Sequence, residues 1–350
     1  MKYVFTFFVT LFSLTIYGQT ERFKKVDSLI DATIKRDYPG LGVGIIKDGS
    51  VIYERYSGLS NLQHQIPFSE KTRSNIASTA KQFTALMILD LSLNEQLNLN
   101  DDLNNYLPNL FNKANSKVKI RHLLNHTSGI PEYVNLLGEE GPVWWKHVGL
   151  DNGDIIELLG KQDALEFEPG SNYSYSNSNY IILAEIIEKV TGNSFTEYSK
   201  KFFQSLGMHE TAFVERYMSV IPNRANPYSD WGRGEWWETP TVTKMSGDGF
   251  LFTTLRDQLK YEQKLQVDRD NLLLKLSQEP ISNSEIKTYG FGLKLQDRLN
   301  RQAVHHDGAT YGFHSQTIRF PNEKLTIFIL SNNGNFRSDL MADQIAKYFL

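Results

Sequence analysis

Two pairs of strand-like segments, one near each end of the chain, place the strongest limit on the fold. Residues 41–47 and 51–56 are β-type runs that flank Asp48-Gly49-Ser50, a sequence typical of a hairpin turn. Residues 312–320 and 325–331 form a second such pair around a four-residue turn. Because strands must satisfy their backbone hydrogen bonds with neighbours, we expect one antiparallel sheet built from both ends of the chain. Two more strands are predicted over residues 289–295 and 303–306.

The middle of the chain has helical periodicity and turns rich in Asn, Asp, Gly and Pro. The predicted helices cover residues 80–93, 117–124, 154–159, 178–190 and 194–206, and a closing helix covers residues 339–350. The fold class is therefore α/β of the α+β kind: an antiparallel sheet flanked by helices, with a mainly helical region inserted. We expect a sheet subdomain of residues 21–77 and 245–350 and a helical subdomain of residues 78–244, with any active site in the groove between them.

The N-terminus has the pattern of a secretory signal peptide. Lys2 precedes an apolar run of about fifteen residues that ends at the small residue Gly18. Cleavage there would remove residues 1–18 and leave residues 19–350 as a single domain that is periplasmic or secreted, without stable membrane insertion. An uncleaved N-terminal anchor is the alternative.

Composition excludes several classes of protein. The formal charge of −3 and the lack of charge runs argue against nucleic acid as a partner. The chain has no cysteine, which excludes disulfides and thiolate metal sites. His122 and His126 have the spacing of a helical zinc site, but Leu123 replaces the glutamate of that motif. We therefore predict no metal and no cofactor.

Ser78-Thr79-Ala80-Lys81 combines a potential nucleophile with a potential base. The spacing places both functional side chains on one face of the predicted helix, within reach of each other. A serine hydroxyl is a weak nucleophile until a neighbouring base takes its proton, and an unprotonated amine can do so. The tetrad therefore suggests acyl transfer. A solvated helix face is the alternative, because such tetrads also arise by chance.

Two further polar clusters could complete such a site. Residues 173–180 contain tyrosines that could shuttle a proton and asparagines that could fix a substrate carbonyl, although the same residues suit a helix N-cap. Residues 305–312 contain a glycine beside polar side chains, on or next to a strand. A ligand could approach the backbone closely there, and its N–H groups could bind an oxyanion; a hairpin turn is the alternative.

In this order, the three clusters resemble the active-site motifs of the penicillin-recognising serine hydrolases. The branch of this family that the chain resembles contains class C β-lactamases, D-alanyl-D-alanine carboxypeptidases, D-aminopeptidases and related esterases. The motifs are Ser78-Thr79-Ala80-Lys81, Tyr175-Ser176-Asn177 and His306-Asp307-Gly308. The resemblance extends from about residue 26 to the C-terminus and includes residues 123–130 and 247–250. It implies a β-lactamase/transpeptidase-like fold.

The resemblance also implies roles for the motif residues. Ser78 would be the nucleophile and Lys81 its base or proton relay. Tyr175 takes the place of the general acid/base, and Asn177 that of an amide that orients Lys81 and the substrate carbonyl.

The third motif would supply substrate and oxyanion contacts through His306, Gly308 and Ala309. The backbone N–H groups of Ser78 and Ala309 would form the oxyanion hole. A base near neutral pH needs a lowered pKa, which cationic neighbours such as His306, together with partial burial, could produce.

The third motif departs from the β-lactamase pattern, which generally has Lys-Thr-Gly where this chain has His306-Asp307-Gly308. Histidine is mostly neutral at pH 7, so we expect weak binding of a β-lactam carboxylate. This favours a serine hydrolase acting on esters or on peptides and amides with D-residues. A true β-lactamase or D,D-carboxypeptidase is the alternative, and an inactive protein that binds cell-wall peptides is the alternative from another class.

Other conspicuous residues lie outside the motifs. The five tryptophans occur in loop-like segments and are expected either to line a substrate groove or to attach long loops to the body. Asp248 and Asp307 are expected to be solvated or turn residues.

Overall fold

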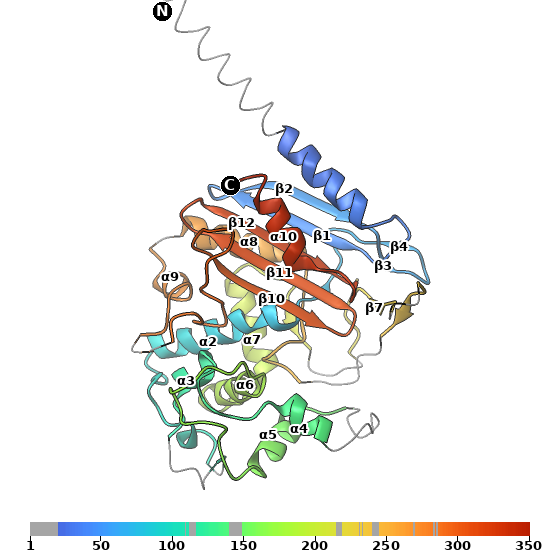
Figure 1. Ribbon diagram of the computed structural model, residues 1–350. Coiled ribbons are helices and arrows are strands. Elements are labelled where there is room, and N and C mark those ends of the chain that lie inside the picture. Colours follow the sequence, from blue (N-terminus) through green and yellow to red (C-terminus); the bar gives the residue numbers. More distant parts are fainter. Residues whose placement is uncertain are drawn as a thin grey trace, which may run out of the picture.

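A five-stranded antiparallel sheet in the order β10-β11-β12-β1-β2 forms the centre of the upper half of the molecule (Figure 1). Its strands are β1 (Leu41–Lys47), β2 (Ser50–Ser57), β10 (Val304–Thr310), β11 (Phe313–Phe320) and β12 (Leu325–Ser331). The two ends of the chain meet where β1 pairs with β12, from Leu41 opposite Ser331 to Lys47 opposite Leu325. This confirms the predicted sheet and the α/β fold class.

The protein is described by a computed structural model, which covers residues 20–108, 110–111, 117–139, 149–214, 219–230, 232, 234–239, 245–268, 270–282, 284 and 286–350. The predicted signal peptide, residues 1–18, lies outside these residues. Within the described part of the chain, no helix is both long and apolar enough to cross a membrane. The subdomain boundaries stay predictions.

Alternation along the strands gives the sheet two apolar faces. Leu41, Val43 and Ile45 of β1 point to a core that they share with a helix over residues 20–33 and with α10 (Ser338–Ala346). Phe328 and Leu330 of β12 point to the opposite face, where α8 (Leu255–Val267) packs. The sheet is thus a layer between helices, and one of its faces is turned toward the helical region.

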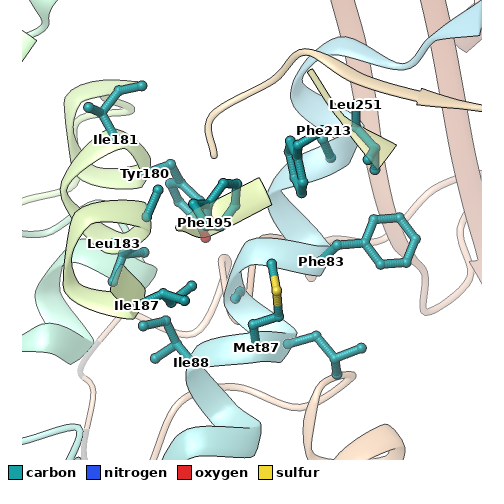
Figure 2. Close-up of a cluster of buried hydrophobic side chains, with 14 of the residues drawn as sticks. Phe83, Met87, Ile88, Tyr180, Ile181, Leu183, Ile187, Phe195, Phe213 and Leu251 are labelled. Atoms are coloured by element: carbon teal, nitrogen blue, oxygen red, sulfur yellow. The ribbon is translucent and has the colours of Figure 1, made fainter. Parts of the chain in front are cut away.

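Helices α2 (Lys81–Leu93) and α6 (Ser178–Thr191) form the centre of the helical region. Figure 2 shows Phe83, Met87 and Ile88 of α2 in one buried cluster with Tyr180, Leu183 and Ile187 of α6. Ten residues of α2 are buried on all sides of the helix, so α2 is a central rather than a surface helix.

Shorter elements surround this core. The helices are η1 (Ala77–Ala80), η2 (Leu103–Asn105), α3 (Ile120–Leu124), α4 (Tyr133–Glu139), α5 (Asn152–Gly160), α7 (Phe195–Ser205) and α9 (Leu272–Leu276). The strands are β3 (Leu59–Asn61), β4 (Ile66–Pro67), β5 (Ser74–Asn75), β6 (Ala212–Phe213), β7 (Tyr228–Ser229), β8 (Trp237–Glu238) and β9 (Leu251–Thr253). The five predicted central helices correspond to α2, α3, α5, α6 and α7.

Two predicted elements differ from the structure, and one helix of the structure was not predicted. Residues 289–295 form isolated bridges instead of a strand, because the chain turns at Gly292 (φ +71°), where a Cβ would lie 2.5 Å from the Lys81 carbonyl oxygen. The closing helix ends at Ala346. Helix α8 was not predicted, because polar residues such as Asp257 and Glu262 lie on its buried side and obscure the apolar period.

Candidate active site

Ser78 and Lys81 lie where η1 continues into α2. Ala77, just before the serine, has φ +47°, which is uncommon for a residue with a side chain and marks a tight turn. Lys81 is the first residue of α2, and its Nζ lies 3.1 Å from the Ser78 Oγ. The sequence spacing has therefore produced a direct hydrogen bond between the two functional groups.

Lys81 is fully buried and surrounded by three acceptors. Its Nζ donates to the Asn177 Oδ1 at 2.7 Å and to the Asp248 backbone oxygen at 2.6 Å, in addition to the Ser78 contact. Amide and peptide oxygens can only accept, so they take two N–H groups of a neutral amine and leave its lone pair for the Ser78 hydroxyl proton. This geometry suits a base that acts on Ser78.

Burial lowers the pKa of Lys81 to about 8, although nearby Asp248, Glu132 and Asp307 act to raise it. The expected lowering is present, and of its two anticipated causes burial acts, whereas cationic neighbours do not. Desolvation produces it, whereas the three charged neighbours named here are acidic and oppose it. A measurable fraction of the amine is therefore unprotonated at neutral pH.

Asn177 is held in one orientation by Glu132. Its Nδ2 donates to Glu132 Oε1 at 2.9 Å, and its backbone N–H donates to the same carboxylate. The amide oxygen is thereby directed at Lys81. Sequence reasoning missed Glu132, whose position just after the familial stretch 123–130 was the one available signal.

The Tyr175 ring packs over the Lys81 amine, with Nζ 5.1 Å from the ring centroid. Burial raises the pKa of Tyr175 above its ordinary value, and an interaction with the Ser78 hydroxyl opposes this effect. The Tyr175 hydroxyl is buried and has no hydrogen-bond partner of normal geometry among the described residues. The phenol therefore stays protonated near pH 7, which suits a proton donor, and Lys81 is the better placed base.

His306 is buried behind this site. Its Nδ1 donates to the Asp307 backbone oxygen at 2.6 Å, so the neutral ring has its Nε2 free to accept from the Tyr289 hydroxyl at 3.0 Å. Burial lowers the pKa of His306 far below its ordinary value. His306 is therefore a neutral ring at pH 7 and does not supply the positive charge that we considered for it.

Gly308 lets β10 run closely beside the nucleophile turn. A Cβ at this position would lie 2.2 Å from the Ile76 backbone oxygen and 3.1 Å from the Ser78 backbone nitrogen. Ala309, the next residue, lines the same pocket as Ser78. The oxyanion-hole assignment stays a prediction, and the close approach of the two segments is what it requires.

A pocket of about 420 Å³ opens at Ser78. Its polar lining includes Ser78, Tyr133, Asn177, Asp248, Thr310 and Tyr311, and its apolar lining includes Val134, Leu137, Leu150, Met245 and Phe250. Asp248 is the one charged side chain among the described lining residues. It is 7% exposed and lies in a bend over residues 247–249, so of the two expectations, a solvated or a turn residue, the first was wrong. Asp307 is half exposed and pairs with Lys294.

The remaining candidates have other surroundings. Trp236 packs edge-on against Tyr38, with ring centroids 5.3 Å apart, and neither it nor the exposed Trp237 is among the pocket-lining residues. Trp144, Trp145 and Trp231 lie outside the described residues.

His126 is buried and its Nδ1 accepts from the Ser176 backbone N–H. In the described part of the chain, no three side chains of His, Asp or Glu cluster as a metal site would require.

Known proteins are similar to this chain in sequence and in fold. The sequence model of the Beta-lactamase family matches residues 26–348. Penicillin-binding protein 4* of Bacillus subtilis is 31% identical over 81% of this chain and 66% of its own length. A D-aminopeptidase of Brucella anthropi is 30% identical over 88% of this chain and 59% of its own length. The chain thus spans about 56–66% of the length of the first curated relatives that it matches.

Solved structures agree with this relationship. The octameric penicillin-binding protein homologue from Pyrococcus abyssi has a TM-score of 0.79 and 26% identity, and the match covers 92% of this chain and 76% of the homologue. D-amino acid amidase from Ochrobactrum anthropi SV3 has a TM-score of 0.75 over 94% of this chain and 98% of the amidase; at 20% identity it supports the fold alone. The chain belongs to the Beta-lactamase family, that is, to the penicillin-recognising serine hydrolases.

Proposed function

We propose that this chain is an exported serine hydrolase that forms an acyl-enzyme on Ser78 and acts on esters or on peptides and amides with D-residues. The observation that carries the proposal is the 3.1 Å contact between Lys81 Nζ and Ser78 Oγ at the edge of a pocket. D-residue substrates are supported by relatives named D-aminopeptidase. Export is supported by the N-terminal pattern of residues 1–18.

The first half-reaction joins the acyl group to Ser78. Lys81 takes the hydroxyl proton while Ser78 Oγ attacks the substrate carbonyl carbon, and the backbone N–H groups of Ser78 and Ala309 donate to the oxyanion. Tyr175 then donates its proton to the leaving nitrogen or oxygen, and Lys81 returns a proton to Tyr175. In the second half-reaction water attacks the acyl-enzyme, and the same groups release Ser78.

A substrate carboxylate has little to bind in this pocket. The described lining residues include no lysine or arginine, and the charged one is the acidic Asp248. Binding of a β-lactam or of a C-terminal carboxylate gains most from a charge-assisted contact. Efficient β-lactamase or D,D-carboxypeptidase activity is therefore the less favoured candidate.

An inactive binding protein is the candidate from another class. Its site would not need a buried amine of lowered pKa in contact with the serine, whereas Lys81 is such an amine. A fluorophosphonate probe separates the two: we expect wild type to be labelled and Ser78→Ala to be unlabelled. No labelling of wild type, under conditions that label a control hydrolase, would overturn the enzyme proposal. Equal labelling of Ser78→Ala would overturn the choice of nucleophile.

The substrate class requires a direct comparison. Hydrolysis of a short acyl nitrophenyl ester, of a D-alanine amide and of a chromogenic cephalosporin is measured with wild type and Ser78→Ala. We expect turnover of the ester and the amide and slow or no turnover of the cephalosporin. Rapid cephalosporin hydrolysis would contradict the inference that the pocket binds a substrate carboxylate weakly.

A further inference from the structure

Residues 246–249 form a segment beside the Ser78 turn, and hydrogen bonds to two helices hold it in place. The Gly247 backbone oxygen accepts from the Thr84 Oγ1 at 2.7 Å, one turn beyond Lys81 on α2. Asn152 of α5 pairs with Ser246 through two hydrogen bonds of 2.9 and 3.0 Å. The Asp248 backbone oxygen is itself a Lys81 acceptor. The backbone of Asp248 is therefore held beside the Lys81 amine by contacts with α2 and α5.

The Asp248 carboxylate is buried and only partly satisfied. Its Oδ2 accepts from the Tyr133 hydroxyl at 3.0 Å, whereas its Oδ1 has no hydrogen-bond partner among the described residues. A buried, underpartnered carboxylate is costly, and such groups persist where they serve a function. Burial raises the pKa of Asp248, and the charge of Lys81 is the largest opposing effect.

Lys81 has several titratable neighbours on the surrounding elements. They are His126 and Glu132 after α3, Tyr133 in α4, Tyr175 before α6, Tyr180 in α6, Asp248 itself, and His306 and Asp307 on β10. Burial keeps the pKa of each histidine low and of each tyrosine high, so these groups are neutral near pH 7. The charges that act on Lys81 are those of the three carboxylates.

The three carboxylates differ in what else they bind. Glu132 receives two N–H groups of Asn177, and Asp307 forms an ion pair with Lys294. The Asp248 carboxylate accepts from the neutral Tyr133 hydroxyl, and its effect on Lys81 is the largest of the three. Asp248 is thus the carboxylate whose charge is directed to the base.

We propose that Asp248 is a positioning residue that acts through Lys81: its negative charge stabilises the ammonium that forms when Lys81 takes the Ser78 proton. The carboxylate takes no proton itself, and the proton passes from Ser78 Oγ to Lys81 Nζ. This role rests on the proposed function, because it requires Lys81 to be the base.

The test is the pH dependence of Ser78 labelling by a neutral fluorophosphonate, which needs no knowledge of the substrate. The labelling rate reports the unprotonated fraction of Lys81 in the free enzyme. Asp248→Asn keeps the shape of the side chain and removes its charge. We expect the midpoint of the acidic limb to move to lower pH by about one unit, since loss of a nearby negative charge disfavours the ammonium. The rate at the high-pH plateau should fall as well.

Three other variants separate charge from structure. Asp307→Asn removes a charge that already has a partner, and we expect a smaller shift in the same direction. Thr84→Val loosens the segment and keeps the charge, so its rate should fall without a downward shift of the midpoint. If Asp248→Asn does not fold, Tyr133→Phe replaces it: loss of the hydroxyl donor favours protonation of Asp248, and a smaller downward shift is expected.

The possible failures are distinct. Absence of labelling in wild type overturns the proposed function and this role with it. Labelling with an unmoved or raised midpoint in Asp248→Asn overturns the role of Asp248 alone. A shift in Thr84→Val equal to that in Asp248→Asn would show that position, not charge, is responsible, and would also overturn it.

Discussion

At the scale of single residues, the chemistry depends on one buried amine. Lys81 has a pKa lowered to about 8 by burial, and the protonated form has no lone pair for the Ser78 proton. We therefore expect kcat/KM for a neutral ester to rise with pH and to level off, with the half-maximal value near pH 8. Well below this midpoint it should fall about tenfold per pH unit. A pH profile of initial rates checks this. A limb with its midpoint near the ordinary lysine pKa would contradict the desolvated environment.

Gly308 is a second residue whose replacement should lower both activity and stability. In Gly308→Ala the new Cβ would lie 2.2 Å from the Ile76 backbone oxygen, so β10 and the Ser78 turn must separate. We expect kcat/KM to fall by about 100-fold, since small displacements of reacting groups are costly, and stability to fall by about 1–3 kcal/mol. Ester hydrolysis and urea unfolding measure the two effects.

Gly160 provides the matched control. It is the last residue of α5, has no positive φ, and a Cβ there would meet Leu110 Cδ2 at the ordinary distance of 3.9 Å. Gly160→Ala should leave activity unchanged and raise stability by at most about 1 kcal/mol. Wild-type activity in Gly308→Ala would show that the close approach of β10 is not needed.

At the scale of elements, helix α7 begins at a cap that the sequence makes visible. Ser194 has extended backbone geometry and its side chain accepts from the Glu197 backbone N–H at 3.2 Å. Ser194→Ala should lower the free energy of unfolding by about 1 kcal/mol, because an N-terminal N–H loses its acceptor. Ser194→Asp should retain most of the stability, and denaturant unfolding of the three proteins provides the measurement. Equal losses in both variants would contradict a capping role.

The elements also show where local patterns are sufficient. The β1–β2 and β11–β12 hairpins follow from strand alternation and turn residues that are adjacent in the sequence, so they could be predicted. Residues 289–295 are also rich in strand-forming residues, but they form no strand, because Gly292 packs against the backbone of α2. Helix α8 was missed because its buried polar residues have partners on distant elements. Local periodicity contains no information on either contact.

At the scale of the whole molecule, one buried ion pair connects the sheet to the helices. Arg319 of β11 is bound to Glu262 of α8 through Nε and Nη2, both at 2.7 Å, and to Gln82 of α2 at 2.6 Å. Both charged side chains are nearly inaccessible. Arg319→Met should cost about 3–5 kcal/mol, because it leaves Glu262 buried without its cation.

Two variants test that this cost comes from the unpaired charge. Arg319→Met combined with Glu262→Met should recover much of the stability, since neither charge is then buried alone. Arg337→Met breaks an ion pair with Asp339 whose arginine is 63% exposed, and should cost about 1 kcal/mol or less. Urea unfolding of all variants provides the comparison. Equal losses in Arg319→Met and Arg337→Met would contradict a connecting role for Arg319.

The sequence by itself determined the two terminal hairpins, the central helices, the family resemblance and the Ser78–Lys81 pair, because hairpin turns, apolar periods and a three-residue spacing act over short stretches of chain. The tertiary structure decided the protonation states of the side chains in the site. Lys81 meets Asn177 and Asp248, which are 96 and 167 residues away in the sequence. Burial then makes its amine a base and makes His306 a neutral ring, and desolvation of this kind exists only once distant segments have packed together.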